Sequence, residues 1–199
     1  EVVFSILMST GEGIFGVDLN GVCTFCNPSA LKVLGYEEAG ELVGQYIHDL
    51  IHRVDAQGEQ CDLSRCGILR KIRENKIGHV EDEIFWRKDG TSFPVEYRSH
   101  PILRDGVVVG GVVSFSDISK RKAADIALRE SEEKFRSIFE QAAIGMAISG
   151  ADGRYVAAND ALCRMLGYDE SELIGLTCLD ITHPDDREAN EASLNDIRC

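Results

Sequence analysis

Positive charge is scarce in this chain of 199 residues, because 34 acidic side chains outnumber 21 lysines and arginines and give a net charge of −13. A nucleic-acid surface needs clustered Lys and Arg to meet the phosphates, and an anionic membrane attracts the same residues. The sequence therefore predicts no nucleic-acid partner and no membrane contact by this stretch. The 44% of apolar residues is still enough for packed cores.

Long apolar runs are also missing. The longest, VVVGGVV from Val107 to Val113, is far shorter than the roughly 20 residues of a membrane-spanning helix, and we find no signal peptide. The chain begins at Glu1 without an initiator Met. We therefore expect a fragment of a longer protein, and that protein is free to hold a membrane anchor elsewhere.

No tight disulfide framework is visible in the cysteine pattern. Seven cysteines are present, but they are loosely spaced and odd in number. This usage favours a reducing compartment over an extracellular one. The expected location is the cytoplasm.

One segment of the sequence occurs twice. CNPSALKVLGY near the start matches AANDALCRMLGY much later, and the offset of about 132 residues predicts two copies of one domain. A turn dipeptide precedes each copy, and a Leu-Val-Gly or Leu-Ile-Gly step follows. The matched positions are Asn20-Gly21, Asn27, Gly35-Tyr36 and Leu42-Val43-Gly44 in the first copy, and Asp152-Gly153, Asn159, Gly167-Tyr168 and Leu173-Ile174-Gly175 in the second.

The first copy is predicted to be α+β, with one antiparallel sheet and helices on one face. Apolar stretches parted by Asn-Gly or Asp-Gly predict strands, and apolar residues at helical spacing predict helices. Along one strand Val95, Tyr97 and Ser99 alternate with polar residues, so these three should face the helices. The predicted elements are two strands in 13–25, a helix over 28–34 capped by Gly35, helical pieces in 38–50, an amphipathic helix over 61–75 with Leu63, Cys66, Leu69 and Ile72 on its apolar face, and strands over 81–87, 93–103 and 107–116.

The opposite face of this sheet should carry Ile84, Trp86 and Val112, with His100 at the surface or an interface. We expect it to be covered, and residues 119–141 form a candidate helix for that role. This helix is either a solvated connector or a weak coiled coil with a second chain, which predicts a homodimer through the helix and the sheet face. Its seam residues are Ala124, Leu128, Ser131, Phe135, Ile138 and Ala142.

The second copy reaches Cys199 before the last three strands of the pattern. Its two strands would leave one edge unpaired, so we expect further sequence or a neighbouring chain to cover that edge. The predicted domains are residues 1–118, a connecting helix over 119–141, and a partial second domain over 142–199.

In the order and spacing of these motifs, the chain resembles the PAS family of sensory domains in tandem, as in bacterial signal-transduction proteins. One departure is His52-Arg53-Val54-Asp55, where the second copy has His183-Pro184-Asp185-Asp186. Besides the repeated positions, the matching residues are Pro28, Phe85-Trp86-Arg87-Lys88-Asp89-Gly90, Phe93-Pro94-Val95-Glu96 and Asp117-Ile118-Ser119.

The resemblance implies a five-stranded sheet with a small cavity under the helices, which in relatives holds a flavin, a haem or a metabolite. It also implies that Asp117, Ile118 and Ser119 couple the sheet to the outgoing helix. The inferred cavity wall consists of Phe85, Val95, Tyr97, Ser99, Val113, Phe115, Cys66 and Leu69, and the inferred interface consists of Trp86, Leu128, Phe135 and Ile138.

The occupant of the cavity stays open. An empty core is favoured over a cofactor. A haem lacks the usual His on helix 61–75, although Cys66 could act as a thiolate ligand and His48 or His52 could approach it. A flavin adduct lacks its Cys at Gln45-Tyr46-Ile47-His48, and a non-covalent flavin would find few polar partners in the wall.

The cysteines offer two further readings. Cys23 and Cys26 look like half a metal site that Cys61 and Cys66 could complete, but residues three apart on a strand point to opposite faces, so we predict no metal site. A thiol switch between Cys61 and Cys66 needs the two sulfurs to approach within bonding distance.

A sensory input and relay module of a cytoplasmic signalling protein is the leading functional hypothesis, upstream of a histidine kinase or diguanylate cyclase in the same chain. No catalytic signature is present, so we expect no enzymatic activity in this stretch. The alternatives are a ligand-free dimerisation module and a redox sensor holding flavin or haem.

Overall fold

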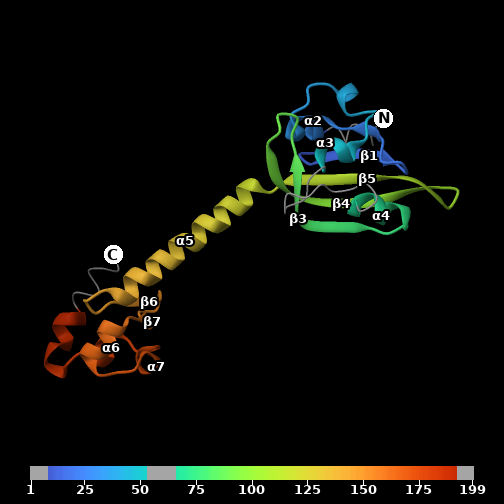
Figure 1. Cartoon of the computed structure of the whole chain (residues 1–199). Helices are drawn as coiled ribbons and strands as arrows, with labels where there is room; N and C mark the ends of the chain where they lie inside the picture. Colours follow the sequence, from blue (N-terminus) through green and yellow to red (C-terminus); the bar gives the residue numbers. More distant parts are fainter. Residues whose placement is uncertain (1–8, 53–65, 192–199) are drawn as a thin grey trace. The chain divides into compact units, whose positions relative to one another are not determined.

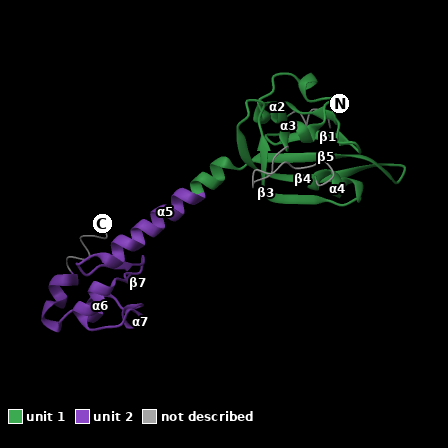
Figure 2. Cartoon of the chain, viewed as in Figure 1, with its two compact units in different colours: residues 1–124 green, residues 125–199 purple. Residues whose placement is uncertain are grey.

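The computed structural model describes residues 9–52 and 66–191. Contacts divide the chain into two compact units, Glu1–Ala124 and Asp125–Cys199 (Figure 2), and each is treated separately below. In the parts of the chain that are described, no helix combines the length and apolar character needed to cross a bilayer.

Unit 1 contains the expected five-stranded antiparallel sheet (Figure 1). Its order is β2-β1-β5-β4-β3, so the first strand of the unit pairs with the last. Alternation along β4 and β5 buries one side chain in two, as the sequence pattern predicts. The strands are β1 Gly13–Asp18, β2 Cys23–Cys26, β3 Gly78–Trp86, β4 Ser92–Arg104 and β5 Val107–Asp117.

Short helices pack on the inner face of this sheet and enclose one apolar core. The amphipathic helix expected over 61–75 is shorter where it is described, because Asn75 takes a left-handed φ of 54°; its predicted positions Cys61 and Leu63 lie outside the described residues. The elements of this layer are α2 Pro28–Leu34, a 3-10 turn at Ala39–Glu41, α3 Ile47–Ile51 and α4 Gly67–Arg73.

The Asn residue that occurs in both copies of the repeated segment has the same structural role in each. The Asn27 side chain accepts hydrogen bonds from the backbone N–H groups of Ala30 (2.8 Å) and Ile14 (2.9 Å), so it caps α2 and ties that helix to β1. In unit 2, Asn159 accepts the same pair from Leu162 (2.9 Å) and Met146 (2.8 Å). A buried carboxamide is costly unless it is fully bonded, so its full set of partners fixes the local geometry.

The outer face of the sheet is more polar than expected. Ile84, Trp86 and Val112 are only half-buried there, while Glu96 binds the imidazole of His79 and the guanidinium of Arg121, both at 3.1 Å. Arg121 belongs to the long helix α5, Ser119–Gln141. Ion pairs therefore hold the start of α5 beside the sheet, and cover of the outer face by the rest of the helix stays a prediction.

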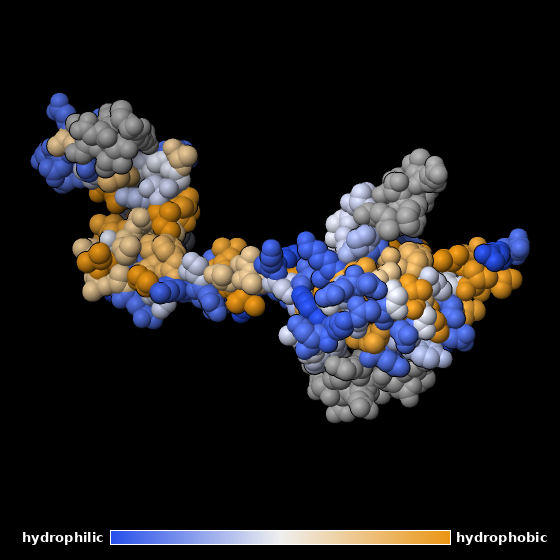
Figure 3. Space-filling model, turned by 90° about the horizontal axis from the view of Figure 1, so that it is seen from above, coloured by the Kyte–Doolittle hydropathy of each residue, from blue (hydrophilic) through white to orange (hydrophobic). Residues whose placement is uncertain are grey.

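Unit 2 repeats the beginning of the fold. A two-stranded sheet is formed by its described residues, and many of its apolar side chains are exposed, including Ile144, Val156 and Met165. Figure 3 shows apolar side chains gathered on the visible face of this unit. That further sequence or a neighbouring chain covers the edge of this two-stranded sheet stays a prediction. The elements are β6 Ala147–Ser149, β7 Tyr155–Ala158, α6 Asp160–Leu166, α7 Glu170–Leu173, α8 Cys178–Ile181 and a 3-10 turn at Pro184–Asp186.

Asn27→Ala is expected to destabilise unit 1 by about 2–4 kcal/mol, since it removes a helix cap and leaves the Ile14 N–H without its acceptor. Urea unfolding followed by fluorescence measures this, because Trp86 is the chain's one tryptophan and lies in unit 1. Asn20→Ala, at an exposed turn, should change stability by less than about 0.5 kcal/mol. Equal effects of the two substitutions would contradict the role given to Asn27.

Candidate functional site

The structure places the predicted cavity wall in the interior of unit 1, and its role in lining a ligand cavity stays a prediction. All eight of its residues are buried, and seven of them belong to the apolar core of unit 1. Phe85 stacks on Tyr97 with ring centroids 5.8 Å apart and also contacts Phe115 at 5.6 Å. The inner face of the sheet is therefore a packed aromatic surface.

Ser99 is the polar exception in this wall. Its hydroxyl is fully buried, and no described group lies within hydrogen-bonding distance. The side chain faces Gly78, its partner across β3 and β4. A buried hydroxyl without a bond lowers stability, so this position is costly as the core stands.

A cluster of two imidazoles and a thiol is buried between the helices and β3. His48 and His52 are four residues apart at α3, which places both rings on one side of the helix, and their centroids are 5.5 Å apart. Cys66 precedes α4, with Sγ 3.8 Å from His52 Nδ1. The exposed fractions of the three residues are only 3%, 4% and 3%.

A carboxylate stands behind this cluster. Glu83 Oε1 lies 3.6 Å from His52 Nε2, on the opposite side of the ring from Cys66. Glu83 pairs with Val95 across β3 and β4, so it shares the inner face of the sheet. The order thiol, imidazole, carboxylate thus runs from α4 through α3 to β3.

The charges of this cluster are strongly coupled. Burial favours the neutral thiol, but hydrogen bonds with His48 and His52 outweigh it and lower the pKa of Cys66 to about 6. Burial also disfavours a charged His52, yet Cys66 and Glu83 raise the pKa of that imidazole to about 9. Both shifts favour a thiolate beside an imidazolium, because each charge stabilises the other.

A second polar group joins the sheet to α5. Asp117, at the end of β5, accepts a bond from the Arg87 guanidinium (2.6 Å) and one from the backbone N–H of Ser119 (2.8 Å). The N–H of Ile118 donates to the carbonyl of Pro94 at 3.0 Å. Partial burial opposes ionisation, but Ser119 and Arg87 lower the pKa of Asp117 below its ordinary value. One carboxylate thus binds the end of β3 and the start of α5 together.

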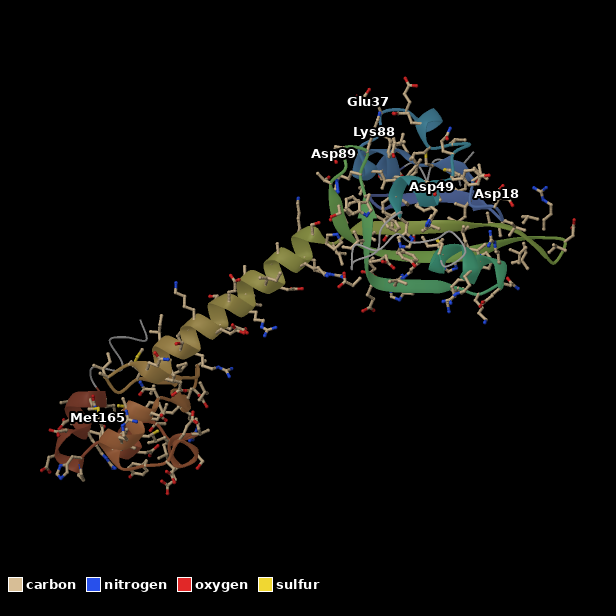
Figure 4. All side chains as sticks on the ribbon, in the orientation of Figure 1. Asp18, Glu37, Asp49, Lys88, Asp89 and Met165 are labelled. Atoms are coloured by element: carbon tan, nitrogen blue, oxygen red, sulfur yellow. The ribbon has the colours of Figure 1, made fainter. Side chains whose placement is uncertain are left out.

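The β3–β4 turn next to Arg87 is held to the helix layer. Lys88 donates its backbone N–H to the carbonyl of Leu34 at 2.9 Å, and its ammonium forms an ion pair with Glu41. Figure 4 shows Lys88 and Asp89 at this end of the sheet, with Glu37 nearby. The Arg87 guanidinium also lies 4.0 Å from the centre of the Phe93 ring.

Comparison with known proteins assigns both units to one family. The PAS domain family matches residues 11–120, more than half of the chain, and a second PAS domain match covers residues 133–198. This chain belongs to the PAS family. The tandem arrangement expected from the repeat is confirmed, with one PAS domain in each unit; the predicted boundaries at residues 118 and 141 stay predictions.

The curated relatives of these PAS domains are parts of larger proteins. A probable diguanylate cyclase, DgcE of Escherichia coli K12, is 48% identical over 59 residues, which cover 30% of this chain and 5% of that protein. Sporulation kinase A of Bacillus subtilis 168 is 23% identical over 184 residues, or 91% of this chain and 29% of the kinase. The chain therefore spans less than a third of either relative.

A solved structure supports the fold. The structure of an RNA-binding light-oxygen-voltage receptor matches this chain with a TM-score of 0.51 and 20% sequence identity. The match covers 68% of this chain and 38% of the receptor chain. At this identity the likeness concerns the fold alone.

The sequence analysis placed Cys23 and Cys26 on opposite strand faces, and this was wrong. A β-bulge skips Thr24, so the two cysteines pair with Val17 and Phe15, two residues on a single face. Burial comes first, with nearby Cys26 second, in raising the pKa of Cys23 to about 12. In the described part of the chain, the group able to offer three metal ligands is instead His48, His52 and Cys66.

The remaining sequence-based site predictions have mixed support. His100 is exposed on the outer face and Trp86 is half-buried there. A thiol pair between Cys66 and Cys61 involves a residue outside those described, and occupation of the core by flavin or haem stays a prediction. Glu83 was missed, although the alternation that places Phe85 inside also places Glu83 there.

Ser99→Ala is expected to stabilise PAS domain 1 by about 1 kcal/mol, because it removes a buried hydroxyl that no described group satisfies. Urea unfolding measures the change, with Ser114→Ala on the outer face of β5 as the matched control. Destabilisation by more than about 1 kcal/mol in Ser99→Ala alone would show that the hydroxyl has a partner and would contradict this assignment.

Proposed function

We propose that this chain is a sensory input and signal-relay module. PAS domain 1 receives the stimulus at its inner face, α5 transmits it, and PAS domain 2 receives it. The observation that carries the proposal is the shared carboxylate of Asp117, which bonds to Arg87 just past the end of β3 and to Ser119 at the start of α5. A shift in the sheet therefore alters the contacts that fix the first turn of the helix.

The relatives support an output elsewhere in a longer protein. They are named as a diguanylate cyclase and a kinase, and an output of either class in the same chain fits a relay. The PAS domains themselves are proposed to be regulatory and to catalyse nothing. A cytoplasmic location belongs to the same proposal.

Dimerisation through α5 is the second element of the proposal. The seam residues Leu128, Phe135 and Ile138 are 61%, 54% and 59% exposed within one chain, and Phe135 stacks on Phe139 at 5.8 Å. Exposed apolar side chains at heptad spacing are stabilised by burial against a second helix. The same seam would also serve a ligand-free dimerisation module, which is the competing function.

Phe135→Glu is expected to convert a dimer to a monomer at micromolar concentrations, because it puts a charge into the seam. Ile126→Glu is the matched control: Ile126 is 58% exposed on the same helix but lies off the seam, so its variant should remain dimeric. Sedimentation velocity measures both. A monomeric parent chain, or dissociation by Ile126→Glu alone, would contradict the seam.

Arg87→Ala tests the relay itself. Although Arg87 lies thirty residues before Asp117, its loss should increase amide hydrogen exchange at the first turn of α5 by about 3- to 10-fold, the scale of a charge-assisted hydrogen bond. Arg104→Ala, an exposed arginine at the far end of the neighbouring strand β4, is the control. Exchange changes confined to β3 and β4 would refute coupling through Asp117 while leaving dimerisation untouched.

A further inference from the structure

Three metal-ligating side chains converge in the core of PAS domain 1, and the relay described above makes no use of them. The donor atoms of His48, His52 and Cys66 all lie within 4.8 Å of one another, and the three residues are buried. We propose that they bind a single divalent transition-metal ion, with Zn²⁺ as the ion best suited to them. The further claim that this ion is the stimulus of the sensory domain rests on the proposed function.

The distances are close to those of a zinc site. With Zn–S near 2.3 Å and Zn–N near 2.0–2.1 Å, tetrahedral geometry puts sulfur and nitrogen ligands about 3.6 Å apart. Cys66 Sγ and His52 Nδ1 are 3.8 Å apart. Movements of about 1 Å or less in side chains therefore close the site around an ion.

Glu83 supplies the support that metal-bound histidines usually have. Its carboxylate faces Nε2 of His52, while Nδ1 of the same ring faces Cys66. Accepting the Nε2 proton fixes the tautomer whose Nδ1 lone pair points toward the ion. This arrangement of carboxylate, imidazole and metal positions His52 without making Glu83 a ligand.

Ligand type and geometry favour a bare ion over a haem. Thiolate with imidazole suits zinc, whereas Ca²⁺ and Mg²⁺ prefer oxygen ligands. A haem offers protein ligands two positions, on opposite faces of its macrocycle, but here three donors meet at one point. On coordination the Cys66–His52 pair releases its one shared proton to solvent, which leaves a thiolate and two neutral imidazoles as ligands and involves no redox change.

The site is connected to the relay through one strand. Glu83 lies within β3, and Arg87 follows four residues later, directly after the end of that strand. Arg87 in turn bonds to Asp117. An ion that draws His52 toward Cys66 changes the contact between His52 and Glu83. We therefore expect Zn²⁺ binding to reach the first turn of α5.

Cobalt and zinc titration of the whole metal-free chain tests the site. One equivalent of Co²⁺ should bind and give a thiolate-to-cobalt charge-transfer absorption, which Zn²⁺ then displaces. Cys66→Ser should abolish this band, and Glu83→Gln should lower Zn²⁺ affinity by about 10- to 100-fold. Cys26→Ser, which removes a cysteine of the same domain outside the cluster, should bind like the parent.

Near-UV circular dichroism will show whether Cys66→Ser folds. If it does not, His48→Gln, which keeps the thiol, is the second variant, and it should weaken Zn²⁺ binding at least 100-fold. The result for the parent chain is decisive in either case. Absence of a cobalt–thiolate band in the parent overturns the proposal. So does a band that survives Cys66→Ser and disappears in Cys26→Ser.

Amide exchange at residues 119–124, with and without Zn²⁺, separates the site from the relay. Binding with altered exchange supports both. Binding without altered exchange upholds the site and overturns the ion as a stimulus. The effect of Arg87→Ala is measured without metal, so failure of the relay is recognised independently.

Discussion

A buried side-chain amide holds each PAS domain of this chain together. Asn27 and Asn159 each lie at the start of a helix, and each accepts one N–H of that helix and one from the first strand of its unit or, for Asn159, from Met146 just before that strand. Because these bonds are enclosed, losing them leaves polar groups without water. In PAS domain 1 these bonds fix α2 against β1, while α3 brings His48 and His52 over β3.

One strand serves both polar groups of the domain. Near its middle, β3 presents Glu83 to the imidazole of His52, and just past its end Arg87 binds Asp117. The aromatic ring of Phe85 lies between them and fills the core. A rigid, packed strand transmits displacement better than a loosely packed one, because close-packed interiors transmit strain.

Strand alternation was enough to predict much of this fold from the sequence. The period of two placed Val95, Tyr97 and Phe115 inside and His100 outside, and the repeated Asn-to-Gly-Tyr spacing predicted both domains. The spacing of His48 and His52 was also visible, as two histidines one helical turn apart. From the sequence, these histidines and Cys66 are candidate haem ligands and not a three-ligand cluster, because the sequence does not show where α4 begins relative to α3.

Strand alternation fails to predict the side-chain directions where a strand contains a β-bulge. The bulge at Thr24 turned Cys26 to the face of Cys23, and an irregularity between Val80 and Glu83 shifts the start of β3 relative to its end. A bulge depends on how two strands pair, so one strand's pattern does not reveal it. Pairing of the α5 seam likewise depends on a second chain.

The central claim is that the buried cluster and α5 are coupled through β3. Backbone ¹⁵N NMR of Glu83→Gln, compared with the parent in the absence of metal, tests it most directly. The account predicts chemical-shift changes at His52 and Cys66 and also at the amides of Ile118 and Ser119. Changes restricted to the neighbours of Glu83, with the amides at the start of α5 unmoved, would contradict it.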